Sequence, residues 1–389
     1  MFTPTTPSWP KKDKWRILFL AFCLSLLSIY PVYRNFYYSN GLLTYERHKA
    51  VIEGHSDFYN PWQYRILCPF AVEGIMWIYN NTVDKIFPIE KKFQVHIDSD
   101  SGISAGTDEF VKLSNTPGVL KYMLIFTLFR FTEHIFIFYL AWRLWSYFIK
   151  SKWLIFFGIN FLALAFGNAV TAADLSFNTY LDIILYLVTA NLIVYNKNKM
   201  WLFLIVPLAA FNRETGLLIP ALYFLSETNF SQFSLKNSDW KKIDFPKRNV
   251  WINTIVLYAI FMAIFIAIRW HYGYVPQQVW KTKAGWSMLK LNLFSAIGVK
   301  AYLELIGSFG VIPFIILYKF KAFPHLLKKW FLFLVPVWFA VHYISVVAYQ
   351  TRLFMVPIIL VFIPMMLWLI EREVTERAAV TVTNKQTGI

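Results

Sequence analysis

The sequence predicts an all-α fold, a polytopic bundle of transmembrane helices. Only 15% of the 389 residues are charged and 57% are hydrophobic, whereas about a quarter of the residues of a soluble domain are charged. Apolar runs of the roughly 20 residues that cross a bilayer recur along the whole chain. Aromatic residues reach 20%, and many Trp and Tyr side chains stand near the ends of these runs, where the membrane interface favours them.

The first span is predicted at 16–33, after a cytoplasmic N-terminus of residues 1–15. Lys11, Lys12 and Lys14 precede this span, and positive charge marks the cytoplasmic side of a membrane segment. The apolar core of the run is long and contains no small-residue cleavage site. We therefore expect it to persist as a helix rather than to be removed as a signal peptide.

A large loop, 34–120, separates this span from the next one. It contains an apolar piece, Tyr64–Tyr79, which carries Arg65, Pro69 and Glu73 and could be a short span or an interfacial helix. If the piece does not cross, the short lysine-containing loops near 150–152 and 197–199 fall on the cytoplasmic side, as the positive-inside rule requires. We therefore predict that it does not cross and that the whole loop lies outside.

The resulting layout has ten spans and places both termini inside. Residues 16–371 form a single transmembrane domain, with a second outer loop at 270–296 and a cytoplasmic tail at 372–389. The spans are 16–33, 121–147, 153–171, 177–195, 200–212, 214–226, 250–269, 297–319, 330–349 and 353–370. Spans five and six are short and should form a hairpin whose tip points outward, since short helices are tolerated where protein surrounds them.

Charge, cysteines and motifs exclude several function classes. The formal charge of +16 is explained by cytoplasmic loops that face anionic lipid, and no nucleic-acid-binding motif accompanies it, so no nucleic-acid partner is predicted. Cys23 and Cys68 give neither a metal spacing nor a disulfide framework. The chain lacks a Walker loop, GxGxxG, HExxH and GxSxG, which argues against an ATP-driven pump, a dehydrogenase, a zinc protease and a serine hydrolase.

The most informative feature is the adjacent pair Arg213 and Glu214, in the otherwise apolar run 201–225. Ionised side chains are costly at bilayer depth and usually face a bundle interior or a water-filled cavity. We expect Arg213 to face an outer cavity and Glu214 to pair with a basic group on a neighbouring span or to cap a helix N-terminus. The alternative is an ion pair that only fixes the bundle, and the same structural role is the alternative for the cluster Arg130, Glu133 and His134.

Two candidate groups lie in the large outer loop. Glu46 and His48 follow span one, and Asp57 comes shortly after them; a solvated amphipathic helix is the competing interpretation. Tyr64 and Arg65 stand among aromatic residues. Arg65 could hold a phosphate with its planar fork, or it could be an interfacial anchor whose charge reaches the water.

Two more candidates stand at the outer ends of later spans. Asp174 follows span three, with Asp182 eight residues further on and deeper in span four; a helix cap is the alternative role for Asp174. Arg352 adds a cation near the outer end of span ten. Together these groups suit chemistry at a membrane surface, because a carboxylate can take a proton from a hydroxyl and arginines can stabilise a departing phosphate.

The order of these features resembles the GT-C superfamily, the polytopic glycosyltransferases that use sugars carried on polyprenyl phosphate. In that superfamily span one leads into a long outer loop with an early acidic residue, and a second acidic residue follows span three. Glu46 or Asp57, and Asp174, occupy the matching places here. The run from Asn212 to Gly216 is similar to one in bacterial members, and the likeness extends over 16–226.

The resemblance implies a glycosyltransferase of the bacterial inner membrane, acting in cell-envelope polysaccharide biosynthesis. A sugar would pass from a polyprenyl-phosphate donor to an acceptor at the outer face, with inversion. Glu46 or Asp57 would be the base and Asp174 would orient the acceptor or hold Mg²⁺ or Mn²⁺, although the sequence requires no metal. Arg65, Arg213 and Arg352 would bind the phosphate; Tyr64, His48 and Glu214 would complete the substrate site.

Three other function classes compete. A transporter or lipid flippase would use the buried ionisable residues as a pathway, although the chain shows no two related halves. A polysaccharide polymerase or ligase would rely on arginines. A non-catalytic subunit of a membrane complex would need none of these residues for chemistry. Convergence of Glu46, Asp174 and Arg213 in one outer-facing cavity would favour the glycosyltransferase.

Overall fold

The computed structural model describes residues 11–38, 40–56, 59–92, 111–112, 115–171, 177–230, 243–279 and 282–387. Nearly all the regular structure in these ranges is helical. The strands are β1 (Gln278–Val279) and β2 (Thr282–Lys283), which pair antiparallel, and an isolated bridge joins Asn229 and Asp244. The predicted all-α class is confirmed.

Seven helices in the described residues are long and apolar enough to cross a membrane. They are α1 (Lys11–Tyr38), α8 (Val119–Phe148), α9 (Lys152–Thr171), α10 (Phe177–Val194), α13 (Arg248–Tyr272), α17 (His325–Ser345) and the segment that starts at Thr351 and ends in α19 (Ile363–Thr387). An eighth span results if α15 (Ala296–Phe309) and α16 (Ile312–Tyr318), bent by 71°, are one span. The chain is therefore a polytopic helical membrane protein.

The predicted spans five and six correspond to two short helices, α11 (Leu202–Asn212) and α12 (Leu218–Glu227), joined by the 3-10 turn η2 (Glu214–Leu217). With 11 and 10 residues, each is shorter than a single bilayer crossing requires. The predicted hairpin is present, but a count of ten spans stays a prediction.

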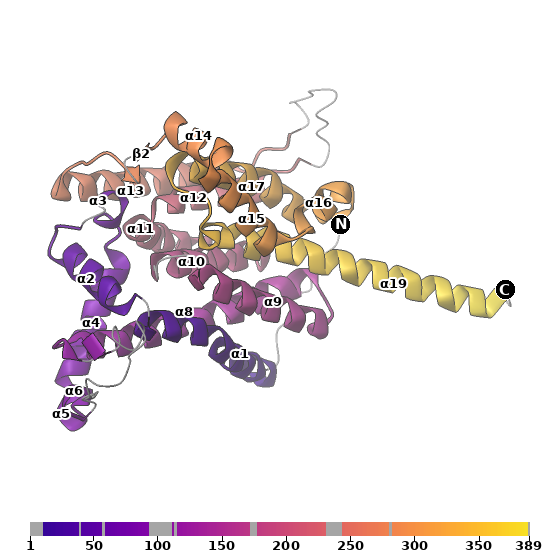
Figure 1. Ribbon diagram of the computed structural model, residues 1–389. Coiled ribbons are helices and arrows are strands. Elements are labelled where there is room, and N and C mark those ends of the chain that lie inside the picture. The colour runs from indigo at the N-terminus through magenta and orange to yellow at the C-terminus, as the bar shows by residue number, and fades with distance from the viewer. Residues whose placement is uncertain are drawn as a thin grey trace.

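In the part of the large loop that the structure describes, five short helices precede α8. They are α2 (Gly41–Ile52), α3 (Tyr59–Trp62), α4 (Leu67–Asn81), α5 (Val83–Ile86) and α6 (Ile89–Lys92). The ambiguous apolar piece corresponds to α4, whose 15 residues are fewer than the roughly 20 of a typical span. These helices gather at one end of the bundle, and α19 projects beyond the opposite end (Figure 1).

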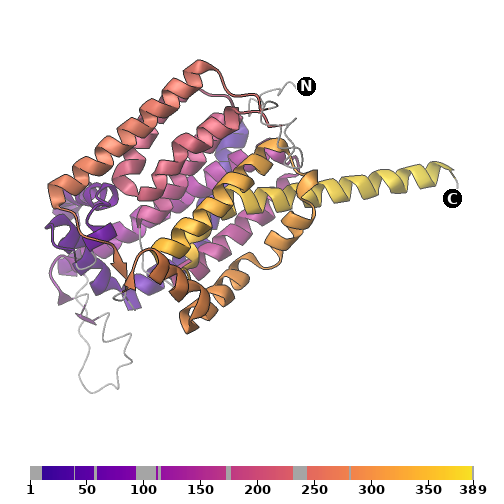
Figure 2. The ribbon, with the colours of Figure 1, turned by 90° about the horizontal axis from the view of Figure 1, so that it is seen from above.

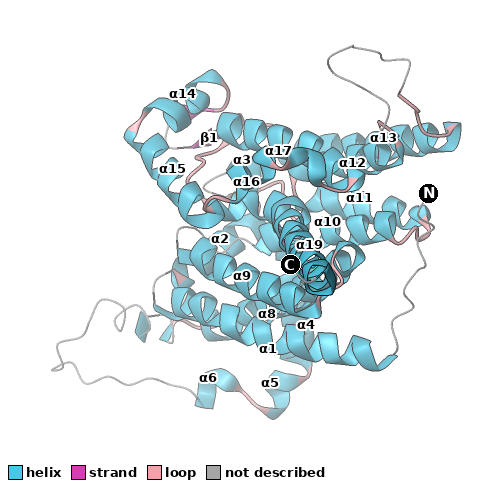
Figure 3. Cartoon of the chain, turned by 90° about the vertical axis from the view of Figure 1, so that its right-hand side faces the viewer, coloured by secondary structure: helices cyan, strands magenta, loops and turns pink. Residues whose placement is uncertain are grey.

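The segment that starts at Thr351 and leads into α19 runs through the centre of the bundle, where Figure 3 shows α19 end-on. Its best span window is 83% buried, the highest of the seven. Pro364 has no N–H to donate to the preceding turn, and a π-helical turn, Ile358–Phe362, stands just before it. The Ile359 carbonyl accepts a hydrogen bond of 2.9 Å from the Trp145 indole of α8. A side chain on a neighbouring helix thus replaces the lost backbone donor.

Close contacts identify which helix ends lie together. At one end, Lys152 at the start of α9 lies 3.7 Å from Asp13 of α1, and the Lys150 backbone N–H donates to Glu371 of α19 at 2.9 Å. At the other end, Asn35 of α1 donates to the Val170 carbonyl of α9 at 3.1 Å. The start of α1 and residue 371 therefore share one end of the bundle.

The structure after Glu371 differs from the predicted polar tail. The sequence predicts only a polar tail at 372–389, whereas α19 continues as a helix to Thr387 and leaves the bundle at an angle (Figure 2). Side chains three and four apart support this extension, for example Arg372 and Glu376 at 2.6 Å.

Candidate functional site

The tip of the α11–α12 hairpin brings the predicted charge pair into the bundle. Arg213 has an extended backbone (φ −157°, ψ 152°) and ends α11, after which Glu214 begins η2. The turn is tight enough at Gly216 to require glycine, because a Cβ there would lie 2.6 Å from the Cβ of Ala209. This tight turn sends Arg213 and Glu214 in different directions. Arg213 is 4% exposed, whereas the Glu214 side chain is 33% exposed.

Glu214 joins three elements that are far apart in the sequence. Its Oε2 accepts hydrogen bonds from Arg65 Nη2 at 2.8 Å and Nε at 3.2 Å. Its Oε1 accepts from Arg269 Nη2 at 3.2 Å. Arg65 precedes α4, and Arg269 stands in the last turn of α13. The pairing predicted for Glu214, with a basic group on a neighbouring span, is confirmed.

Arg213 is held differently. Its Nη1 donates to Thr179 Oγ1 of α10 at 3.1 Å, and its buried Nε has no hydrogen-bond partner among the described residues. The charged groups that act on it are Arg65, Asp182, Glu214 and Arg352. An arginine at this depth is costly unless something compensates its charge.

Polar side chains of α10 line the inner side of the tip. Thr215 donates to Asp182 Oδ2 at 2.7 Å, whereas Asp182 Oδ1 is buried with no partner among the described residues. Asn212 donates to the Asn178 carbonyl at 2.8 Å, and Asn178 donates back to the Asn212 carbonyl at 3.4 Å. These reciprocal bonds fix the hairpin against α10. They therefore also fix the position of Arg213, which follows Asn212 directly.

We call these charged groups the arginine cluster: Arg65, Arg213, Arg269 and Arg352, with Glu214 and Asp182. When both carboxylates are ionised, the four guanidinium groups leave an excess of two positive charges. Partly buried cations with spare donors bind anions, and the planar guanidinium fork suits phosphate. The arginine cluster is thus a candidate phosphate site.

Tyr64, which stands just before α4, contacts Arg269 of the arginine cluster. The Tyr64 hydroxyl donates to the Gly273 carbonyl at 2.7 Å and accepts from the Val275 N–H at 3.0 Å. The Arg269 guanidinium lies 4.4 Å from the centre of the Tyr64 ring, a cation–π contact. Tyr64 therefore orients Arg269. Burial raises the pKa of the nearby Cys68 thiol, which makes that thiol unreactive.

A second group of polar residues lies on α2, α4 and α8. His48 Nε2 is 2.9 Å from Glu73 Oε1, and Tyr122 donates to the same oxygen at 2.7 Å. The hydrogen bond from His48 is the main reason that the pKa of Glu73 is lowered, although burial opposes it. His48, predicted to touch substrate, is thus paired with Glu73, while Glu46 on the same helix is exposed.

The structure does not show whether the predicted catalytic carboxylates, Glu46 or Asp57 with Asp174, lie together. Asp57 and Asp174 lie outside them, and no described contact links Glu46 to the arginine cluster. Within the described ranges, no group of three or more His, Cys, Asp and Glu side chains is arranged to hold a metal ion.

The third cluster is deep in α8. Arg130 Nε lies 3.1 Å from Glu133 Oε2, and both side chains are buried. The Arg130 guanidinium stacks 3.6 Å from the centre of the Tyr180 ring, and His134 Nδ1 is 2.7 Å from Ser28 Oγ of α1. These contacts fit the structural role considered for this cluster, which ties α1, α8 and α10 together.

Of the predicted binding residues, Arg65, Arg213 and Glu214 converge, with Arg352 close enough for its charge to act on Arg213. Arg269, Thr179 and Asn178 were not singled out. The signal for Arg269 was available, since it is an arginine at the end of an apolar run. No local pattern in the sequence marks Thr179 or Asn178, which depend on the pairing of α10 with the hairpin.

Comparison with known proteins identifies no relative. No family model matches the chain, and neither curated proteins nor solved structures give a significant match. The likeness to GT-C glycosyltransferases therefore stays an expectation drawn from sequence patterns.

Proposed function

We propose that this protein is a membrane glycosyltransferase that moves a sugar from a polyprenyl-phosphate donor to an acceptor at the outer face of the membrane. The observation that carries the proposal is the excess of positive charge in the arginine cluster, where the buried Arg213 keeps an unpartnered Nε. A lipid phosphate is an anion that reaches such a site from the bilayer. The ten-span layout, with the cluster on the outer side, belongs to the same proposal.

In the proposed reaction the arginines bind the donor phosphate and favour its departure. An acceptor hydroxyl attacks the anomeric carbon while the bond from that carbon to the phosphate oxygen breaks. The electron pair passes to the phosphate, whose growing charge the guanidinium groups stabilise. The hydroxyl proton passes to a carboxylate, for which Glu46 and Asp57 are the candidates by resemblance, and Asp174 orients the acceptor.

Phosphate recognition is tested by comparing polyprenyl phosphate with the uncharged polyprenol of equal length. The purified wild-type protein should prefer the phosphate, and Arg213→Ala should lose most of that preference while Arg213→Lys keeps part of it. Loss of a charge-assisted hydrogen bond corresponds to about 1.5–3 kcal/mol, or roughly tenfold to a hundredfold in affinity. The control is Arg372→Ala, because Arg372 is exposed on α19.

Transfer itself is tested in proteoliposomes loaded with a polyprenyl-phosphate hexose that carries a radiolabelled sugar, with membrane extract as the source of acceptor. Wild-type protein should release polyprenyl phosphate and label an acceptor, and Arg213→Ala should not. Equal binding of phosphate and alcohol, or full transfer by Arg213→Ala, would contradict the proposal.

A transporter or flippase is the second candidate, favoured by one observation. Arg130 Nη1 and Nη2, Glu133 Oε1 and His134 Nε2 are buried and have no hydrogen-bond partner among the described residues. Ionisable groups of this kind inside a membrane often line a substrate or proton pathway. Proton-coupled flux across proteoliposomes that is lost in Glu133→Gln, without any sugar transfer by the wild type, would favour this candidate. A non-catalytic subunit would show neither activity.

A further inference from the structure

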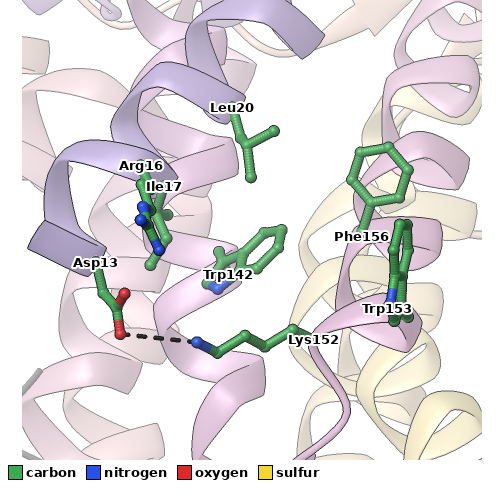
Figure 4. Close-up of a pocket in the computed structure, with 8 residues that line it drawn as sticks. All are labelled: Asp13, Arg16, Ile17, Leu20, Trp142, Lys152, Trp153 and Phe156. Carbon is green, nitrogen blue, oxygen red and sulfur yellow. Dashed lines mark ion pairs between the residues drawn. The ribbon is translucent and has the colours of Figure 1, made fainter.

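A cavity at the end of the bundle opposite the arginine cluster has the character of a lipid site. It has a volume of about 420 Å³ and lies between the start of α1, the last turns of α8 and the start of α9. It is lined by Asp13, Arg16, Ile17, Leu20, Trp142, Lys152, Trp153 and Phe156 (Figure 4). Charged groups and apolar groups are both present, so the cavity is amphipathic.

The apolar part of the cavity suits an acyl chain. Ile17 and Leu20 form one wall on α1, and Trp153 and Phe156 form the facing wall on α9 (Figure 4). Trp142 of α8 lies between the two walls, is 5% exposed, and has an indole N–H without a hydrogen-bond partner among the described residues. Tryptophan at a membrane interface commonly has an apolar environment for its ring and a polar one for its N–H.

The charged part of the cavity is set by three side chains. Arg16 and Lys152 come from opposite walls, and Asp13 lies 3.7 Å from the Lys152 ammonium, as the dashed line in Figure 4 shows. Two cations and one carboxylate leave one excess positive charge. Charge complementarity therefore favours a ligand with a single net negative charge, and the bilayer supplies one in anionic phospholipids.

We propose that this cavity binds one anionic phospholipid, with its phosphate between Arg16 and Lys152 and an acyl chain between α1 and α9. The phosphate competes with Asp13 for Lys152. Since the lipid contacts both helices, it holds α1 and α9 together at the end of the bundle where both helices begin. Positive-inside orientation places this end at the cytoplasmic leaflet, so the site is separate from the proposed transfer reaction and does not depend on it.

The test compares phosphatidylglycerol with phosphatidylcholine bound to the purified full-length protein, by native mass spectrometry and by thermal stability. Wild-type protein should prefer phosphatidylglycerol and should be stabilised by it, because a ligand of the folded state raises the melting temperature. Arg16→Ala and Lys152→Ala should each lower that preference roughly threefold, the range of an exposed ion pair. Asp13→Asn should raise it, since the competitor for Lys152 is removed.

Matched variants separate this site from general attraction of lipid to a basic surface. Lys14→Ala changes an exposed lysine of α1 that does not line the cavity, and Lys197→Ala changes an exposed lysine after α10 that does not line it either; both should retain the wild-type preference. Leu20→Trp should fill the apolar part and abolish the preference without changing charge. Glycerol phosphate without acyl chains should not stabilise the protein.

Three results would overturn the proposal. The first is equal binding of the two phospholipids to wild-type protein. The second is an equal loss of preference in Lys14→Ala and Lys152→Ala, which would indicate attraction to a basic surface only. The third is full stabilisation by glycerol phosphate, which would indicate a phosphate site without a lipid chain.

Discussion

At the scale of single residues, the interactions of Glu214 make a direct prediction about stability. Glu214→Ala leaves Arg65 and Arg269 facing each other without the carboxylate that separates them. Removal of one partner of a buried pair costs about 3–5 kcal/mol. We expect a loss nearer 2 kcal/mol, because the Glu214 side chain is 33% exposed and partly screened. The melting temperature in detergent measures the change.

The control for this prediction is Glu373→Ala. Glu373 pairs with Lys319 at 3.5 Å, and both side chains are 45% exposed, so its removal should cost less than about 1 kcal/mol. The double variant Glu214→Ala/Arg269→Ala should recover part of the lost stability, since one of the two unpaired cations is then absent. Equal effects of Glu214→Ala and Glu373→Ala would show that the charge pairs with Glu214 contribute little.

Glu73 gives a prediction about pH. Its pKa is lowered from 4.5 in the folded protein, chiefly by the hydrogen bond from His48. A carboxyl group whose folded pKa lies below its unfolded value stabilises the fold above the unfolded pKa. That contribution is lost as the pH falls through the folded pKa. We therefore expect the melting temperature of the wild type to exceed that of Glu73→Gln at pH 7. The difference between the two melting temperatures should shrink as the pH drops below 4.5.

The melting temperatures of both proteins across pH 3–8 provide the measurement for Glu73. Glu46→Gln serves as the control, because Glu46 is exposed on the same helix, α2, that carries His48. Its difference from wild type should stay small at every pH. A constant gap between wild type and Glu73→Gln from neutral to acid pH would exclude ionisation of Glu73 as its cause.

At the scale of elements, the α11–η2–α12 hairpin positions the arginine cluster, and Gly216 is its tightest point. Gly216→Ala would place a methyl group 2.6 Å from the Cβ and 3.1 Å from the carbonyl carbon of Ala209. Overpacking of this kind costs about 1–3 kcal/mol. We expect a lower melting temperature together with weaker binding of polyprenyl phosphate, because the turn that carries Arg213 must open.

Gly307→Ala is the matched control for the hairpin. Gly307 lies in α15 with nothing within 4 Å of the Cβ position, and alanine favours a helix over glycine by about 1 kcal/mol. Its melting temperature should therefore stay unchanged or rise, and its binding of polyprenyl phosphate should be unaffected. If Gly216→Ala behaves in the same way, the tight turn does not control the site.

At the scale of the whole molecule, hydropathy predicted the long helices well. Local sequence patterns could not predict the bends between helices or the side-chain contacts that connect distant helices. The long apolar runs define α8, α9 and α13 to within a few residues. The bend between α15 and α16, where Gly310 has φ +55°, was missed because the run 297–319 is apolar on both sides of it. Arg213 and Glu214 stood out because charge is rare in such runs.

The partners of the charge pair were harder to predict. Arg65 and Arg269 meet at Glu214 from positions about 150 residues before it and 55 residues after it. This meeting depends on how α4 and α13 pack against the hairpin, which no periodicity specifies. The catalytic carboxylates are a different case, since Asp57 and Asp174 lie outside the described residues and stay predictions.

The last prediction concerns how the whole bundle sits in the membrane. Contacts place Lys150 and Glu371 at one end of the bundle, and the hydrogen bonds of Tyr64 place Gly273 with the loop before α4, in the part of the chain that gathers at the other end. Single cysteines at Lys150, Lys197 and Glu373 should therefore react alike with a membrane-impermeant maleimide. Cysteines at Asn81, Lys91 and Tyr274 should form a second class with the opposite accessibility.

The labelling is done in a background in which Cys23 and Cys68 are replaced by alanine. In intact cells the second class should be labelled from outside, and the first class only after permeabilisation, because the lysine-rich loops favour the cytoplasmic side. This result would place the arginine cluster at the outer face, where the proposed transfer occurs, and the lipid cavity at the inner leaflet. Labelling of Asn81 and Tyr274 from opposite sides would mean that α4 crosses the membrane. The shared end inferred from the Tyr64 contacts would then not correspond to one membrane face.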